Sequence, residues 1–295
     1  MNENGFKIIR LDQKDAPKVN ELVSKAFGYL PPDKYFDDFP IWNSNSAIRL
    51  GLLDGSKLAS HVGVRFTLMK TSKGAERVAL IGAVATDEAY RGKGCSTKLL
   101  TEAIRLSEEK GNTWIFLWGS EHGFYEKFGF HLSGEQLRAK IRDLQIDPKL
   151  LVGNDPGQKV KPEIKTGLTE RIFEFMCQTQ AGVELTLEDH DWFFAHKNVK
   201  WFSLEKPFSF IAYQRGMDLQ HIVHEYGGDL SGIETLLYHI YQIDPDAQII
   251  GNENTLMNLG FSEDRIIQEY LCMARSTPPN QIWNPEFWIS GLSAC

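Results

Sequence analysis

The chain has 295 residues, of which 42% are hydrophobic and 24% are charged, as expected for a globular protein of one large or two ordinary domains. Its net charge is −7 and its sequence pI is near 5.7, without a Lys/Arg block interleaved with aromatic residues, so we expect no nucleic-acid partner. No apolar stretch approaches the roughly 18 residues that a membrane-spanning helix needs, so we expect no membrane partner either.

The cysteines give no sign of a metal site or a disulfide framework. Cys95, Cys177, Cys272 and Cys295 lie far apart and form no Cys-x-x-Cys pair. The amino terminus lacks the basic segment and apolar run of a signal peptide. We therefore expect a cytoplasmic protein without a bound metal, and a homo-oligomer is compatible with the sequence.

The first half predicts a helix after one strand, a three-stranded meander, and then a second helix and a buried strand. Val19, Leu22 and Val23 recur at helical spacing, whereas Trp114 to Trp118 is an apolar run typical of a strand buried on both faces. The expected elements are a strand over 6–11, a helix from Asp12 or Asp15 to Gly28, strands over 47–53, 58–68 and 78–86, a helix over 96–110, a strand over 114–118, a short helix over 124–128 and a strand at Phe130.

The second half repeats this order of elements after a polar, Pro- and Gly-rich linker at 151–165. It predicts strands over 208–215 and 219–226, a helix over 230–242, a strand over 247–250, and Leu256 to Phe261 in the place of Tyr125 to Phe130. We predict an α/β (α+β) fold of two tandem domains, 1–150 and 166–295, each with a mixed, mostly antiparallel sheet flanked by helices.

The turn Arg91-Gly92-Lys93-Gly94-Cys95-Ser96 joins a strand end to a helix start. The first amides of a helix are unpaired and carry partial positive charge, and glycines let a ligand approach the backbone, so such a turn can cradle a pyrophosphate. A tight strand-to-helix connection explains the same pattern. A dinucleotide-binding fingerprint fits poorly, because it needs Gly or Ala where this chain has Thr97, and no Walker-type loop is present.

Residues 84–100 closely resemble the acyl-CoA-binding motif of the GNAT acetyltransferase superfamily. That motif is Arg or Gln, two residues, Gly, one residue, and Gly or Ala; Arg91 and Gly94 match it, and Ser96 stands at its last position. The family's second motif, Tyr, three residues and Gly-Phe, is matched by Tyr125 and Gly129-Phe130. The Val-Ala-Thr strand end at 84–86, the strand end at 117–120 and the tandem layout resemble the enhanced-intracellular-survival type, without its sterol-carrier-like domain.

The resemblance implies that acetyl-CoA is the co-substrate and that no metal takes part. In the family, pantetheine pairs with the strand at 84–86, pyrophosphate binds the amides at 92–97, and Tyr125 protonates the departing thiolate. The implied acetyl-CoA-binding residues are Val84, Ala85, Thr86, Arg91, Gly92, Lys93, Gly94, Cys95, Ser96, Thr97, Ser120 and Glu121.

We therefore predict an N-acetyltransferase that acts on a primary amine of a small molecule or peptide. Most of an amine with a pKa near 10 is protonated at pH 7, so a base must remove a proton before attack, and a strand amide near Val84 can stabilise the oxyanion. The base stays open among Glu121, His122, Asp87 and the terminal carboxylate of Cys295. A non-catalytic acyl-CoA sensor is the alternative, and aminoacyl transfer from tRNA is disfavoured by the negative charge.

The second half has no equivalent of the phosphate-binding turn, because the acidic Asp229 precedes its helix. It also has no equivalent of Tyr125, whose place is taken by Leu256. We expect it to be non-catalytic and to form one wall of the acceptor pocket, opposite the loop at 29–42. Asp189-His190-Asp191 is interpreted as a helix start whose acids favour the helix dipole, and Cys95 as a small core residue.

Overall fold

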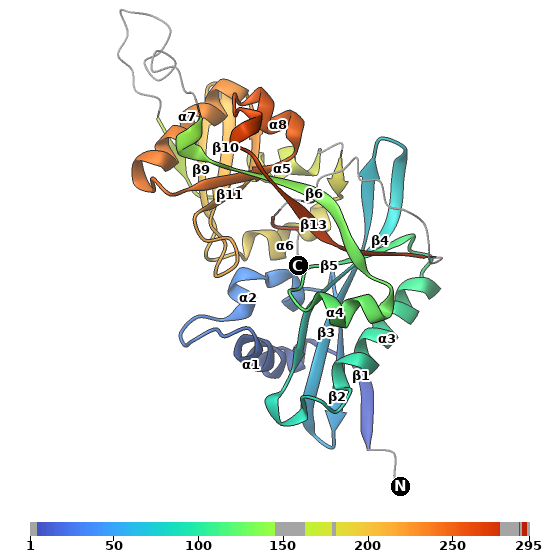
Figure 1. Cartoon of the computed structure of the whole chain (residues 1–295). Coiled ribbons are helices and arrows are strands. Elements are labelled where there is room, and N and C mark those ends of the chain that lie inside the picture. The colour runs from blue at the N-terminus through green and yellow to red at the C-terminus, as the bar shows by residue number, and fades with distance from the viewer. Residues whose placement is uncertain (1–4, 145–162, 179–180, 278–288, 290, 294–295) are drawn as a thin grey trace, which may run out of the picture.

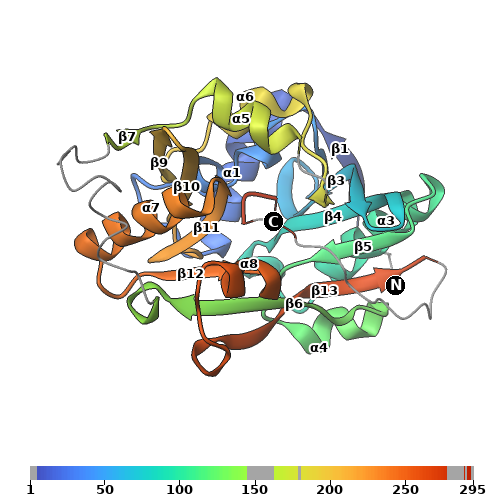
Figure 2. The same cartoon turned by 90° about the horizontal axis from the view of Figure 1, so that it is seen from above.

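The computed structural model describes residues 5–144, 163–178, 181–277, 289 and 291–293. Within them, thirteen strands form one mixed sheet flanked by helices, which confirms the predicted mixed α/β fold (Figures 1 and 2). The strand order is β1-β2-β3-β4-β5-β13-β6-β12-β11-β10-β9-β7, and β8 pairs with β3 off this path.

The helices and strands fall into two halves with the same order of core elements. The first half contains β1 (Phe6–Leu11), α1 (Ala16–Ala26), α2 (Tyr35–Asp38), β2 (Ile48–Asp54), β3 (Lys57–Thr71), β4 (Gly74–Thr86), α3 (Cys95–Glu109), β5 (Trp114–Leu117), α4 (His122–Tyr125) and β6 (His131–Lys140). The second half contains β7 (Lys165–Thr166), α5 (Glu170–Cys177), β8 (Gly182–Val183), α6 (His190–Phe194), β9 (Lys200–Glu205), β10 (Phe208–Tyr213), β11 (Ile222–Gly228), α7 (Leu230–Ile243), β12 (Gln248–Gly251), α8 (Glu253–Asn258) and β13 (Ile267–Ser276).

The two halves exchange their last strands. In the first half, β2, β3 and β4 form an antiparallel meander and β5 is parallel to β4; in the second half, β9, β10 and β11 form the meander and β12 is parallel to β11. However, β6 pairs with β12 of the second half, and β13 returns to pair with β5 of the first. The strands β6 and β13 also pair with each other, so they run side by side through the middle of the molecule (Figure 1).

Helices cover both faces of each meander. In the first half, α3 packs on one face through Leu99, Leu100 and Ala103, while α1 and α2 lie on the other face (Figure 1). The α1 face shares one hydrophobic cluster with the second half, in which Trp42 of the first half joins Phe193 of α6. Because this cluster contains fully buried side chains from both halves, burial of apolar surface holds the halves together.

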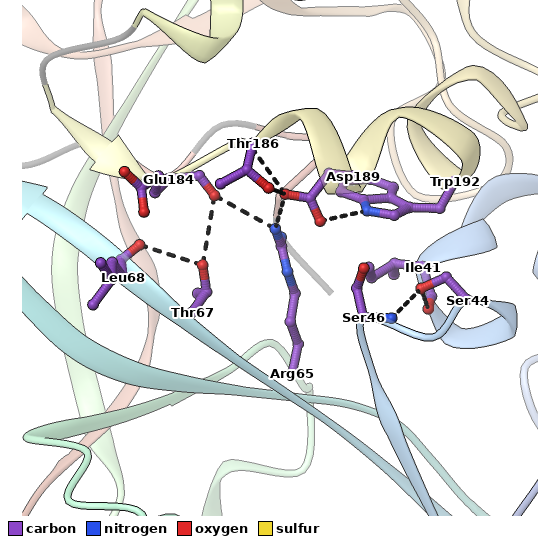
Figure 3. Close-up of polar contacts among 10 residues, drawn as sticks. All are labelled: Ile41, Ser44, Ser46, Arg65, Thr67, Leu68, Glu184, Thr186, Asp189 and Trp192. Atoms are coloured by element: carbon purple, nitrogen blue, oxygen red, sulfur yellow. Dashed lines mark hydrogen bonds and ion pairs between the residues drawn. The ribbon is translucent and has the colours of Figure 1, made fainter.

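A buried ion pair adds to this contact between the halves. Arg65 on β3 contacts Asp189, just before α6, with Nη2 3.2 Å from Oδ2, and both side chains are less than a tenth exposed. Figure 3 shows the Arg65 side chain reaching from its strand to the Asp189 carboxylate, which also accepts a 2.7 Å hydrogen bond from Trp192 Nε1. Asp189 is the N-cap of α6, as the prediction of a helix start there implies. Its carboxylate is also held by Arg65 and Trp192.

No helix in the described residues is long and apolar enough to cross a membrane. The predicted elements agree with the observed ones to within a few residues for α1, α3, β5 and α7. Two long strands, β9 and β13, were not predicted.

Candidate functional site

The site begins where β4 and β5 separate. The parallel pairing of the two strands ends at Ile81 opposite Leu117, at the end of β5, while β4 continues to Thr86. The backbone of β4 from Gly82 to Thr86 therefore has β3 on one side only. A strand edge of this kind can accept an extended, amide-containing ligand through main-chain hydrogen bonds.

A β-bulge shapes this strand edge. Ala85 pairs with His61 and Gly82 with Gly63, so Ala83 and Val84 together oppose one residue of β3. Ala83 has a φ of 50°, in the left-handed region that non-glycine residues rarely adopt. The bulge places Val84 at the centre of the free edge.

His61 and Ser60 hold the bulged strand with their side chains. His61 is fully buried, and its Nδ1 lies 2.8 Å from the carbonyl oxygen of Ala83. Because a carbonyl only accepts hydrogen bonds, Nδ1 carries the proton. Ser60 Oγ donates a 2.7 Å hydrogen bond to the carbonyl of Ala85. These two bonds fix the backbone on both sides of Val84.

Protonation of His61 is expected to weaken the fold in acid. Burial lowers its pKa to about 4, below the ordinary value of 6.5, so its contribution is fully present above pH 6.5 and is lost as the pH falls toward 4. His61→Asn keeps a donor for Ala83, and we expect its free energy of unfolding to fall less steeply between pH 6 and pH 5, by up to about 1.4 kcal/mol per pH unit. Urea unfolding at several pH values measures this slope.

The exposed histidine of β6 provides the control for this experiment. His131→Asn makes the same chemical change at a solvated site. Its free energy of unfolding is expected to change with pH as steeply as that of the wild type. Burial also lowers the pKa of His196, to about 3, so all three proteins keep some loss of stability in acid. Parallel slopes for wild type and His61→Asn would contradict a neutral buried His61.

The predicted phosphate-binding turn lies directly after this strand edge. Gly92 and Gly94 have φ values of 76° and 75°, which glycine adopts without strain. Gly94 is the N-cap of the fifteen-residue helix α3, no side chain caps it, and no acidic residue lies in the first turn. Among the described residues, no carboxylate therefore caps the amides of Cys95, Ser96 and Thr97 at the positive end of the helix dipole.

Basic side chains lie around this turn. Arg91 and Lys93 are exposed on the turn, and Lys98 follows in the first turns of α3. Cys95 is 1% exposed and packs with Leu99 in the core, and burial raises the pKa of its thiol. The side chain of Cys95 is therefore a core residue, and an anion at this turn would meet backbone amides and lysine or arginine.

Tyr125 lies at the end of α4, on the opposite side of the strand separation. Its ring packs on Gly119, where an added Cβ would come within 2.7 Å of Cε2. In the described residues its hydroxyl has no hydrogen-bond partner, and it lines the cleft. Burial, and then the charge of Glu121, raise the pKa of Tyr125, so the phenol stays protonated at neutral pH and can donate a proton or a hydrogen bond.

These features enclose a cleft of about 590 Å³. Seven of the predicted site residues line it: Val84, Ala85, Thr86, Arg91, Ser120, Glu121 and Tyr125. The others do not line it: Gly92, Lys93 and Gly94 form the turn that continues from Arg91, and Cys95, Ser96 and Thr97 are the first residues of α3. The strand edge, the helix start and the tyrosine are thus brought together in space.

The four candidates for a general base lie in different surroundings. Glu121 is exposed and lines the cleft. Asp87 accepts a 2.9 Å hydrogen bond from the amide of Ala89 and lies 3.4 Å from Lys57, so its carboxylate is already held as a turn cap. His122 is exposed outside the cleft lining, and Cys295 lies outside the described residues.

The cleft also contains residues that were not predicted individually, most of them from the two segments expected to form the walls of the acceptor pocket. Phe27, Tyr29, Tyr35 and Phe39 of the first half form an aromatic wall, of which the predicted loop at 29–42 supplies all but Phe27. Met217 and Asp218 come from the loop between β10 and β11 of the second half. No sequence signal marks this loop, because its place at the cleft depends on the packing of one half on the other.

The second half lacks the same arrangement at its equivalent helix, α7. Asp229 is the N-cap of α7, and its Oδ1 accepts hydrogen bonds from the amides of Ser231 and Gly232 at 3.0 and 3.3 Å. Leu256, in the place of Tyr125, is fully buried in the core. The amides that are free at α3 are thus already occupied at α7. The described residues contain no group of three or more His, Cys, Asp or Glu side chains that could hold a metal ion.

Comparison with known proteins bears on both the sequence and the fold. Residues 7–133 match the family model of an acetyltransferase (GNAT) domain. No curated protein sequence matches the chain.

Solved structures share the fold over nearly the whole chain. A probable N-acyltransferase from Enterococcus faecalis V583 superposes with a TM-score of 0.65 at 17% identity, covering 92% of this chain and 72% of that one. Eis1 from Mycobacterium abscessus gives 0.60 at 14% identity (92% and 73%), and a putative acetyltransferase from Pyrococcus horikoshii gives 0.56 at 16% identity (93% and 89%). Residues 7–133 therefore match an acetyltransferase (GNAT) domain in sequence, and the whole chain shares the fold of these three structures.

Proposed function

We propose that this protein is an N-acetyltransferase that transfers the acetyl group of acetyl-CoA to a primary amine of a small molecule or peptide by direct attack. The observation that carries the proposal is the shared cleft, which is lined by the free edge of β4, by Arg91 of the turn that leads to the uncapped start of α3, and by Tyr125. The match of residues 7–133 to an acetyltransferase domain supports the same reading.

Each part of the cleft suits one part of acetyl-CoA. The free edge at Val84, Ala85 and Thr86 offers backbone groups to the pantetheine amides, with Ser120 and Glu121 across the cleft. The pyrophosphate would bind the amides from Gly92 to Thr97, with Arg91 and Lys93 adding positive charge. No anionic side chain caps these amides, so an entering pyrophosphate has no carboxylate to displace.

The reaction needs two proton transfers and no covalent enzyme intermediate. The neutral amine attacks the thioester carbonyl carbon, and a backbone amide near Val84 donates a hydrogen bond to the oxyanion that forms. As the intermediate collapses, the C–S bond breaks and Tyr125 donates its proton to the departing thiolate sulfur. A base takes the proton that the amine loses, and Glu121 is the one candidate base among the described residues that lines the cleft.

The second half is proposed to be a non-catalytic domain of a tandem GNAT arrangement similar to the enhanced-intracellular-survival type. We assign residues 1–150 to the catalytic domain, 151–165 to a linker and 166–295 to the second domain. Occupation of the α7 amides by Asp229 and the core position of Leu256 support one active site per chain.

Binding and turnover together test this function. Acetyl-CoA at 100 times its Kd is expected to stabilise the protein by about 2.7 kcal/mol, whereas NAD at the same concentration is expected to give no shift. Thiol release in the presence of an amine panel measures turnover. The absence of any shift with acetyl-CoA would overturn the proposal, and a shift without thiol release for any amine would favour the alternative, a non-catalytic acyl-CoA sensor.

A further inference from the structure

The wall that the second half contributes to the cleft carries a fixed carboxylate. Asp218 lies in the loop between β10 and β11 and, with Met217, lines the cleft that is otherwise built by the first half. Its side chain is 42% exposed, so a ligand in the cleft can reach it. The carboxylate is therefore brought to the cleft by the packing of the two halves.

Arg215 positions this carboxylate. Its Nε donates a 3.3 Å hydrogen bond to Oδ1 of Asp218, and its Nη2 donates to Oδ2. The guanidinium is 3% exposed, donates through Nη1 to the carbonyl of Gly291, and lies over the ring of Phe39 at 4.3 Å. These contacts fix the orientation of Asp218 before any ligand binds, which lowers the entropy cost of binding.

A second carboxylate lies beside the first. Asp38 is 1% exposed and accepts a 2.6 Å hydrogen bond from the hydroxyl of Tyr29, whose side chain also lines the cleft. Burial raises the pKa of Asp38. To a smaller extent the negative charge of Asp218 also raises this pKa and the positive charge of Arg215 lowers it, so both groups lie within electrostatic reach of Asp38. Asp218 therefore forms an ion pair with Arg215, and Asp38 lies within reach of the charges of both.

The charged side chains of the cleft come from both halves. The basic residue Arg91 comes from the turn that precedes α3, whereas Asp218 comes from the second half. Glu121, near the end of β5, is the other acidic residue of the lining. This arrangement suits an anionic acyl donor along the first half and a cationic acceptor against the second.

The aromatic wall of the first half, together with Met217, gives the cleft a largely apolar surface. Tyr35 and Phe39 are stacked with ring centroids 4.5 Å apart, and Phe27 and Met217 complete the surface. Such a surface binds an apolar body well. In the described lining, Glu121 and Asp218 are the acidic side chains and Arg91 is basic, so a polycation with three ammonium groups has more charges than the lining has carboxylates.

We propose that Asp218 binds the ammonium group of the acceptor and that the acceptor is a monoamine with an apolar body, of the arylalkylamine class. This inference rests on the proposed acetyl transfer, because it assigns the acceptor side of the same cleft. The ammonium pairs with Asp218 on entry, and the apolar body packs on the aromatic wall. One proton of that ammonium passes to Glu121, the exposed candidate base of the lining, and from there to solvent, which gives the neutral amine that attacks the thioester.

Phenethylamine, butylamine and spermidine are the probes that test it. We expect kcat/KM for phenethylamine to exceed the values for butylamine and spermidine by about tenfold or more. Asp218→Asn is expected to raise the KM for phenethylamine by about 10- to 100-fold and to leave the KM for acetyl-CoA unchanged, because a charge-assisted hydrogen bond to the amine is lost. Asp218→Glu keeps the charge and is expected to lose less.

Asp246→Asn is the matched control, since Asp246 is exposed and its Oδ1 lies 3.9 Å from Nη1 of Arg142. Calorimetric titration of phenethylamine in the presence of CoA gives a second readout that needs no turnover. Equal phenethylamine affinity in wild type and Asp218→Asn, or a preference for spermidine, would overturn the inference. Failure of the proposed function can be told apart from failure of this inference. If the protein does not use acetyl-CoA, then neither the wild type nor any variant will show a thermal shift with acetyl-CoA.

Discussion

Tyr125→Phe is expected to lower kcat for amine acetylation by about 100-fold or more and to leave acetyl-CoA binding unchanged. A positioned general acid contributes typically about 10² to 10⁴ in rate. Tyr125 lines the cleft, its hydroxyl has no hydrogen-bond partner in the described part of the chain, and burial raises the pKa of its phenol. Steady-state thiol release and a thermal shift with acetyl-CoA measure the two quantities.

Two comparisons separate the acid role from packing. Tyr270→Phe makes the same change at a tyrosine that is 65% exposed on β13, and its kcat should equal that of the wild type. Gly119→Ala keeps the hydroxyl but places a Cβ 2.7 Å from the Tyr125 ring, so kcat should fall, whereas Gly123→Ala meets no atom within 4 Å and should not change it. Unchanged turnover in Tyr125→Phe would remove Tyr125 from the acid role.

The local part of this site could be predicted because its signals are local. Glycines with positive φ, an uncapped helix start and a tyrosine before Gly129-Phe130 all follow from short stretches of sequence. The helix α3 was predicted from the period of its apolar residues, since only one of its faces packs on the sheet. The structure adds that these stretches converge on one cleft.

The non-local part could not be predicted for a physical reason. The first residues of β13 are exposed and the following ones are buried between β5 and β6, so the strand shows no alternation of apolar and polar residues. The exchange of β6 and β13 is equally invisible, because strand pairing across the halves leaves no trace in either segment alone. Asp218 was missed for the same reason: its role depends on Arg215 and on the contact between halves.

The contact between the halves is expected to depend strongly on Arg65. Its guanidinium reaches across from β3 to the Asp189 carboxylate and to the carbonyl of Glu184, and it lies 5.1 Å from the Trp192 ring (Figure 3). Arg65→Met removes the cation but leaves Asp189 buried with its charge. Removal of one partner of a buried ion pair typically costs about 3–5 kcal/mol, because the remaining charge has lost its compensation.

Urea unfolding and thermal unfolding measure this loss, which corresponds to a fall in Tm on the order of 10 °C. Arg142→Met is the matched control: Arg142 lies 3.9 Å from the exposed Asp246, and pairs of this kind contribute about 1 kcal/mol or less. The double variant Arg65→Met/Asp189→Asn should lose less stability than the sum of the two single losses, because it leaves no unpaired buried charge, whereas each single variant leaves one. Two results would contradict this expectation: additive losses, or an Arg65→Met variant that is no less stable than Arg142→Met. Either would mean that the shared apolar cluster alone holds the two halves together and thereby keeps Asp218 at the cleft.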